Sequence, residues 1–160
     1  MNTPHIWLRA ETKPNEQRTP LTPRGAKTLI DKGFRITVEI ARDRIFPIDD
    51  YRAAGCEVVE GGAWIDAPSD AFILGLKELA EEDFELEHRH IHFAHVFKGQ
   101  SGASEMLGRF IAGGGSLYDL EYLLLENGRR IAAFGYWAGS CGAALGVLAP
   151  ANKAAGAARP

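Results

Sequence analysis

Short apolar runs and helical stripes alternate along this chain. Two of the runs, Phe72–Leu76 and Ile91–Ala94, end at a titratable residue, Lys77 and His95 respectively. Runs of roughly four to six apolar residues between polar ones favour strands of a parallel sheet covered on both faces, although a buried helical turn shows the same pattern. The carboxyl ends of neighbouring parallel strands share one edge, where open α/β sheets bind ligands. We therefore expect Lys77 and His95 to face one crevice, an amine and an imidazole placed for proton transfer.

Helix boundaries are marked by capping residues. Thr22 is a candidate N-cap with Pro23 at the first helical position, and Gly33 ends this helix. Asp49 and Asp50 precede a shorter helical stretch, which ends at Gly55. A further helix is expected to start at Gln100–Ser101, to carry an apolar stripe of Ala103, Met106, Leu107, Phe110 and Ile111, and to end at Gly113–Gly115.

The remaining pattern completes an α/β domain. Strands are predicted at His5–Ala10, Phe34–Ile40 and Cys56–Val59. Small residues from Tyr136 onward suggest a closely packed helix. The repeated order of strand then helix predicts a mostly parallel sheet. We assign residues 1–148 to this domain and residues 149–160, which are low in complexity and have no apolar stripe, to a tail.

Composition narrows the classes of protein that the chain can represent. With 160 residues, 46% of them hydrophobic, it can bury one sizeable core. The net charge of -3 gives no general attraction to nucleic acid or anionic membranes. No apolar segment approaches the roughly 18 residues that span a bilayer, and the first residues lack a secretory pattern, so the expected location is the cytoplasm.

Neither the cysteines nor the histidines predict a metal centre. Cys56 and Cys141 lie far apart without metal-ligand spacing, which argues against a zinc site or a disulfide framework. His88, His90 and His92 would share one face of a strand, but no carboxylate or cysteine motif accompanies them, so we expect no metal. A final set is expected in the core rather than at a cofactor: Met106, Phe110 and Tyr118.

Five motifs in order resemble the N-terminal half of the NAD-dependent, lysine-forming saccharopine dehydrogenases. They are ETKPNEQRTPLTP from Glu11, GLKE from Gly75, FAH from Phe93, LYDLE from Leu117 and GRRIAAFGYWAG from Gly128. The first three occur in looser form in alanine dehydrogenase and in the proton-translocating transhydrogenase. The resemblance covers roughly residues 5 to 148, and it implies a three-layer Rossmann-like fold like the N-terminal domain of alanine dehydrogenase.

The resemblance also implies an activity and a set of site residues. The family cleaves saccharopine to L-lysine and 2-oxoglutarate with reduction of NAD, and each step after hydride removal moves a proton. By resemblance, Lys77 takes the amine proton and His95 serves the water and carbinolamine steps. Glu78 and Glu121 match carboxylates that adjust the charge of this pair. Arg18 and Arg130 match basic residues that hold substrate carboxylates, which a guanidinium binds bidentately.

Each assignment has a structural alternative. Lys77 and Glu78 could form an ordinary solvated charge pair, and His95 could be a core histidine with satisfied hydrogen bonds. Arg18 and Arg130 could simply be exposed at the surface. Glu121, inside an apolar run, could form a buried salt bridge.

The chain departs from the family where a dinucleotide-binding domain is expected. No GxGxxG occurs anywhere in the sequence, and the chain stops where the family continues. We therefore expect a truncated or frame-shifted substrate-side half that lacks the nicotinamide-binding domain. Cofactor-binding residues stay unassigned. On its own, such a half should not bind NAD tightly and should show no NAD-dependent turnover. Its missing partner would be a C-terminal dinucleotide-binding domain.

Two other hypotheses are consistent with the same residues. The chain could be a stand-alone module that binds an amino acid or a keto acid without catalysis. A binder has no need of a proton-transfer pair, so Lys77 and His95 argue mildly against it. The chain could also be an inert product of a broken gene.

Overall fold

The computed structural model describes residues 3–97, 99, 101–133, 135, 138–141 and 143–144. The chain divides into two compact units, Met1–Leu123 and Leu124–Pro160. In the part of the chain that is described, no helix has the length and hydropathy needed to cross a membrane.

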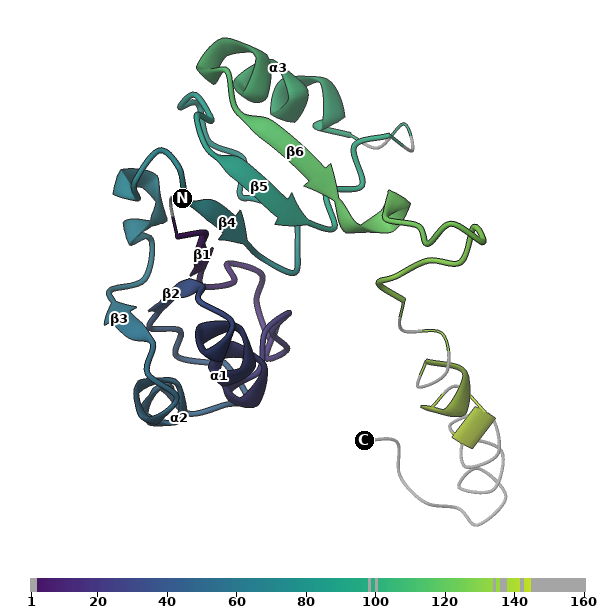
Figure 1. The fold of residues 1–160 in the computed structure, drawn as a ribbon. Coiled ribbons are helices and arrows are strands. Elements are labelled where there is room, and N and C mark those ends of the chain that lie inside the picture. Colours follow the sequence, from purple (N-terminus) through teal and green to yellow (C-terminus); the bar gives the residue numbers. More distant parts are fainter. Residues whose placement is uncertain are drawn as a thin grey trace, which may run out of the picture. The chain divides into compact units, whose positions relative to one another are not determined.

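A six-stranded parallel sheet forms the centre of the first unit (Figure 1). Its spatial order is β3-β2-β1-β4-β5-β6, which is a doubly wound α/β sheet whose winding direction reverses between β1 and β4. The strands are β1 His5–Leu8, β2 Arg35–Glu39, β3 Glu57–Val59, β4 Phe72–Leu74, β5 Arg89–His92 and β6 Ser116–Asp119. The predicted α/β, Rossmann-like fold is thus confirmed.

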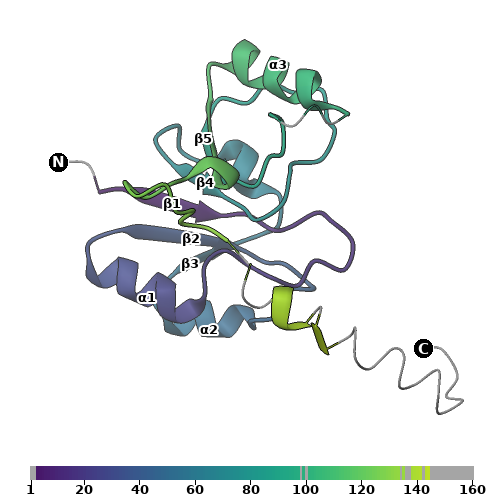
Figure 2. The ribbon, with the colours of Figure 1, turned by 90° about the vertical axis from the view of Figure 1, so that its right-hand side faces the viewer.

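Helices cover both faces of the sheet, so the unit has three layers (Figure 2). Side chains alternate along β1, so Leu8 joins the core beneath α1 and α2 while Trp7 joins the core on the opposite face. Trp64 of η1 and Phe110 of α3 complete that second core. The helical elements are α1 Pro23–Asp31, α2 Ile48–Ala53 and α3 Ala103–Gly113, with 3-10 turns η1 Ala63–Asp66 and η2 Leu120–Tyr122.

The N-cap predicted for α1 is confirmed, whereas α3 begins later than predicted. The Thr22 hydroxyl accepts a hydrogen bond from the Gly25 N–H at 3.1 Å, with Pro23 at the first position. The N-cap of α3 is Gly102, later than the predicted Gln100–Ser101. At the other end Gly114 takes the left-handed conformation with φ 71°, as a glycine terminator should.

The structure corrects the strand that precedes His95. It spans Arg89–His92 rather than Ile91–Ala94, because the side chains of His90 and His92 are completely buried in the sheet. Burial, reinforced for His90 by the neighbouring His92, lowers the pKa of both imidazoles to about 3, so they are neutral near pH 7. Strand β4 also stops earlier than predicted, at Leu74 rather than Leu76.

Two residues expected in the core are exposed. Met106 and Phe110 are buried as predicted, but 82% of Ile111 and 49% of Tyr118 are accessible to solvent. Tyr118 lies on β6, the last strand of the sheet, and no further strand among the described residues pairs on its outer side. Ile111 therefore extends the predicted stripe beyond the part of α3 that contacts the sheet.

The second unit begins with a turn. The Leu125 N–H donates to the Arg129 carbonyl at 2.8 Å, and Leu124 pairs with Arg130 in an isolated antiparallel bridge. Residues 138–141 and 143–144 are helical, as predicted from the small residues. All six are exposed, so the close packing that was also predicted is not found in these residues. The predicted tail, residues 149–160, lies outside the described residues. In the described part, Cys56 and Cys141 are free thiols, and no group of three or more potential metal-ligating side chains is present.

Candidate active site

A pocket of about 450 Å³ lies at the carboxyl ends of the central strands. It therefore occupies the position where doubly wound sheets bind ligands, beside the switch point between β1 and β4. Four segments line it: Thr12–Lys13 after β1, Glu78–Glu81 after β4, Ala94–Val96 after β5, and Ser101–Ala103 with Met106 at the start of α3.

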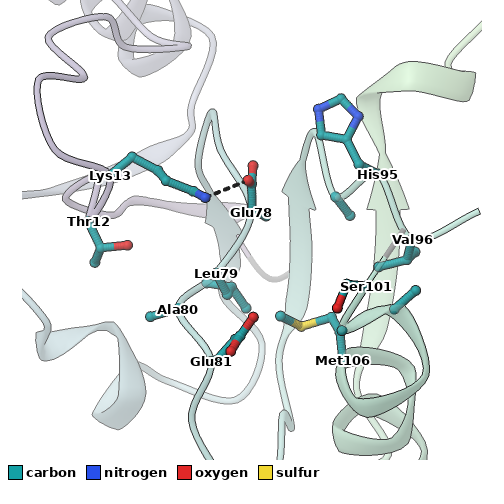
Figure 3. A pocket seen from close by; sticks show the side chains of 13 residues that line it. Thr12, Lys13, Glu78, Leu79, Ala80, Glu81, His95, Val96, Ser101 and Met106 are labelled. Carbon is teal, nitrogen blue, oxygen red and sulfur yellow. Dashed lines mark ion pairs between the residues drawn. The ribbon is translucent and has the colours of Figure 1, made fainter. Parts of the chain in front are cut away.

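Lys13 and Glu78 form an ion pair on one wall of the pocket, and His95 lies across from them (Figure 3). The Lys13 Nζ is 2.7 Å from the Glu78 Oε1. Partial burial opposes ionisation of Glu78, but the hydrogen bond from Lys13, together with the charges of Lys13 and His95, lowers the pKa of this carboxyl below its ordinary value. The hydrogen bond to Glu78 likewise raises the pKa of Lys13. The pocket therefore holds a carboxylate paired with an ammonium, opposite an imidazole.

Lys77 points its amine toward Glu16. The Lys77 Nζ is 4.0 Å from the Glu16 Oε2, and the Arg18 Nε donates to the Glu16 Oε1 at 2.7 Å. The hydrogen bond from Arg18 lowers the pKa of Glu16, which is 7% exposed. Lys77 does not line the pocket. The structure thus joins Lys77, Glu16 and Arg18 in one chain of charges beside the Lys13–Glu78 pair.

His95 has an unusual backbone conformation. Its φ is 58°, in the left-handed region that a residue with a side chain rarely occupies. The turn before it is fixed by two hydrogen bonds, from the Phe93 N–H to the Leu76 carbonyl at 3.1 Å and from the Ala94 N–H to the Asp119 Oδ1 at 3.3 Å. Such conformations persist where the surrounding contacts impose them, and they concentrate at functional sites.

The other predicted site residues are distributed over both units. Glu121 lies in η2, and its N–H donates to the Asp119 Oδ1 at 2.9 Å, so Asp119 caps this turn. Arg130 belongs to the second unit and is exposed. Of the six predicted residues, Glu78 and His95 line the pocket, and Lys77 and Arg18 lie in the adjoining chain of charges.

Sequence reasoning missed the residues that hold the backbone of these turns. Glu11 accepts the Lys77 N–H and Arg9 donates to the Lys77 carbonyl. Asp119 accepts the Ala94 N–H. Lys13 and Glu16, from the same loop as Glu11, pair with Glu78 and Lys77. One available indication was the concentration of charge in the segment directly after β1, the strand at the switch point.

The described residues do not fit a nicotinamide dinucleotide. A dinucleotide fold places a glycine-rich turn between its first strand and helix so that the backbone can approach the pyrophosphate. Here residues 9–22, which connect β1 to α1, contain no glycine, and the helix opens on the Thr22 cap and Pro23. We therefore assign no cofactor-holding residue in this chain.

Comparisons with known proteins agree with this fold. The family model described as alanine dehydrogenase/PNT, N-terminal domain, matches residues 7–141. The chain is 53% identical over 154 residues to a saccharopine dehydrogenase [NAD(+), L-lysine-forming] of Schizosaccharomyces pombe, and 57% identical over 143 residues to that of Candida glabrata. A solved L-alanine dehydrogenase has the same fold, with a TM-score of 0.65 at 21% identity over 78% of this chain and 34% of that one.

These matches cover this chain far more fully than they cover the relatives. The alignments include 96% and 89% of this chain but only 42% and 38% of the Schizosaccharomyces and Candida proteins. The chain thus spans about two fifths of the length of these relatives and corresponds to their N-terminal portion, as the motifs predicted. On the strength of the family model and the parallel sheet, this chain belongs to the alanine dehydrogenase/PNT N-terminal domain family.

Proposed function

We propose that this chain is the substrate-side half of an oxidoreductase that cleaves saccharopine to L-lysine and 2-oxoglutarate with NAD. The observation that carries the proposal is the pocket at the switch point, where an imidazole faces a lysine–carboxylate pair and a second lysine lies alongside. The relatives that match nearly the whole chain are named for this lysine-forming reaction.

Proton transfer is the part of the chemistry that these residues supply. The substrate nitrogen must be neutral before oxidation, and Lys77 takes its proton. Water then adds to the imine carbon and the carbinolamine collapses, and His95 moves the protons of both steps. Positioned acid–base groups of this kind contribute about 10² to 10⁴ in rate. A nicotinamide dinucleotide would supply the hydride acceptor, and residues other than the described ones would have to hold it.

Charge in and beside the pocket suits a substrate with several carboxylates. Lys13 and Arg18 are cationic groups in the loop after β1, each paired with a glutamate, Glu78 and Glu16. A substrate carboxylate can exchange with these glutamates as partner of the cations, since guanidinium and ammonium groups both bind carboxylates. Glu78 and Glu121 are proposed to adjust the charge around Lys77 and His95, and Arg130 to hold a substrate carboxylate.

Complementation in trans tests the proposal. The full chain is mixed with the C-terminal segment of the Schizosaccharomyces relative, and NADH oxidation is followed with lysine and 2-oxoglutarate. We expect turnover only when both pieces are present, and a loss of about 10² or more with Lys77→Met or His95→Gln. The matched control is Lys32→Met, at the exposed end of α1. Turnover by the chain alone would contradict the assignment of dinucleotide binding to a different segment.

A binding module without catalysis is the second candidate, favoured by the glycine-free loop after β1. Calorimetry separates the two candidates. Binding of saccharopine together with complementation supports the enzyme half. Binding of 2-oxoglutarate or lysine at the same site, without turnover in the presence of the C-terminal segment, supports the module.

A further inference from the structure

Glu11 holds the backbone at the base of the Lys77 side chain. Its carboxylate, 7% exposed, accepts the Leu76 N–H at 2.7 Å through Oε1 and the Lys77 N–H at 3.0 Å through Oε2. Both bonds are assisted by the carboxylate charge, which makes them roughly twice as strong as bonds between neutral groups. A residue 66 positions earlier in the sequence thus fixes the first peptides after β4.

Arg9 binds the next peptide group, to which the Lys77 carbonyl belongs. This guanidinium, 1% exposed, lies with its Nη1 3.6 Å from the Glu11 Oε2 and donates through its Nη2 to the Lys77 carbonyl. The Lys77 residue is therefore bound at its N–H by an anion and at its carbonyl by a cation. The two charged groups neutralise one another and satisfy the polar backbone that burial would otherwise leave without partners.

Gly75 provides the space for this arrangement. A Cβ atom at position 75 would lie 2.4 Å from the Arg9 Nε and 2.6 Å from its Cζ, closer than non-bonded atoms approach. Arg9 has no room to retreat because it is enclosed by protein. The glycine in the Gly75–Glu78 motif is thus explained by the buried guanidinium.

We propose that Glu11, together with Arg9, is a positioning residue for Lys77, which sets the backbone from which the catalytic amine projects. This rests on the proposed function, in which Lys77 takes a proton from the substrate. Stability alone gives little reason for the cluster, because hydrophobic residues of similar volume are commonly as stable as a buried ion pair. Proton transfer does need it, since a misplacement of about 1 Å can cost about a hundredfold in rate.

The first measurement is amide hydrogen exchange in the full chain by NMR. In Glu11→Gln one acceptor oxygen becomes an NH₂ group that faces a backbone N–H. We expect the Leu76 and Lys77 amides to exchange at least about tenfold faster, while the Ile73 amide inside β4 is unchanged. The control is Glu57→Gln at the start of β3, a carboxylate bound by the side chains of Arg35 and Thr37.

The second measurement reports on the amine itself. Acetylation of each lysine by acetic anhydride is followed over a range of pH by peptide mass spectrometry. In Glu11→Gln the acetylation rate of Lys77 should change at least about threefold relative to that of Lys27, because the backbone that carries the Lys77 side chain is no longer held in place. Glu57→Gln should leave this ratio unchanged. When Glu11→Gln is assayed together with the C-terminal segment, kcat should fall and the KM for lysine should stay unchanged, since Glu11 contacts the backbone and not the substrate.

The outcomes separate this inference from the proposed function. Unchanged exchange and labelling of Lys77 in Glu11→Gln would overturn the positioning role even if the complemented enzyme is active. Faster exchange with altered labelling supports the role, and an inactive wild-type mixture then counts against the function alone. If Glu11→Gln does not fold, Glu11→Asp serves instead: it keeps both oxygens but withdraws them by one methylene, and it should show the same effects at smaller size.

Discussion

The two turns that carry the proposed acid–base residues are held by different means. The turn after β4, with Lys77, is fixed by two charged side chains from the loop after β1, those of Arg9 and Glu11. The turn after β5, with His95, is fixed by its own backbone, which takes a φ of 58°, and by the single carboxylate of Asp119. One turn depends on buried charge and the other on local conformation.

This difference shows where each turn is vulnerable. Removal of a buried charge leaves its partner without compensation, so the Lys77 turn should be sensitive to substitutions far away in sequence. A left-handed residue stores conformational energy in its own peptide, so the His95 turn should respond to substitution of His95 itself. The two turns are linked, because the Phe93 N–H donates to the Leu76 carbonyl at 3.1 Å.

The largest effect should come from Arg9→Met. It leaves the Glu11 carboxylate and the Lys77 carbonyl buried without the guanidinium, and the free energy of unfolding should fall by about 3–5 kcal/mol. Urea unfolding measures this. In the control Arg35→Met, the lost pair with Glu57 is about half exposed, so the change should stay below about 1 kcal/mol. Equal losses in the two variants would mean that the Lys77 turn does not depend on buried charge.

Gly75→Ala should have the next largest effect. The added methyl group would overlap the Arg9 guanidinium, and overpacking of this kind costs about 1–3 kcal/mol. Gly108→Ala is the matched control. No atom lies within 4 Å of a Cβ at Gly108, and it is in α3, so alanine there should stabilise by up to about 1 kcal/mol. A stabilising Gly75→Ala would contradict the close contact with Arg9.

At His95 the glycine variant should be more stable than the alanine variant, and at Lys77 the alanine variant should be the more stable one. His95→Gly should be more stable than His95→Ala by about 1 kcal/mol, because glycine occupies the left-handed region without strain. Lys77 has no positive φ, so Lys77→Gly should be less stable than Lys77→Ala by about 0.5–1 kcal/mol. Thermal unfolding of the four variants measures both differences. If glycine and alanine had the same order of stability at both positions, the two turns would not differ in backbone conformation as proposed.

The smallest effect concerns the exposed part of the Lys77 turn. The pKa of Glu78 is lowered in the folded chain, so its contribution is present above the ordinary value of 4.5 and is lost as the pH falls through the lowered pKa. Lys13→Met should therefore reduce stability near pH 6 by at most about 1 kcal/mol, and the difference from wild type should shrink as the pH falls through the lowered pKa of Glu78. Unfolding over a range of acid pH measures it, with Lys32→Met as the charge control; a difference that does not shrink with acidification would contradict the ion pair as its source.

The architecture could be predicted from the sequence because short stretches of sequence mark where each strand and helix lies. An apolar run located β4, and alternating apolar and polar residues located β2. The Thr22 cap and Pro23 located the start of α1, and the repeated order of strand then helix predicted the parallel sheet. From the parallel sheet it followed that residues after neighbouring strands share one edge. His95 does line a pocket there together with Glu78, but Lys77, which was predicted to face the same crevice as His95, does not line it.

Local patterns failed where polar residues are buried or apolar ones exposed. The β5 strand was misplaced because His90 and His92, polar by type, are neutral and fully enclosed. Tyr118 and Ile111 were expected inside, but an edge strand and the outer side of a helix leave them in solvent. Burial is decided by neighbours that a sequence window does not contain.

Only the tertiary structure decided what supports the site. The residues around Lys77 in the sequence do not indicate that Glu11, 66 positions earlier, accepts the Lys77 N–H. Nor do they indicate that the Arg9 guanidinium leaves room only for a glycine at position 75. The left-handed backbone of His95 is likewise set by contacts after the strand rather than by residue type. Hydrogen bonds between buried charges and backbone depend on three-dimensional distance, which the order of the sheet fixes and hydrophobic periodicity does not.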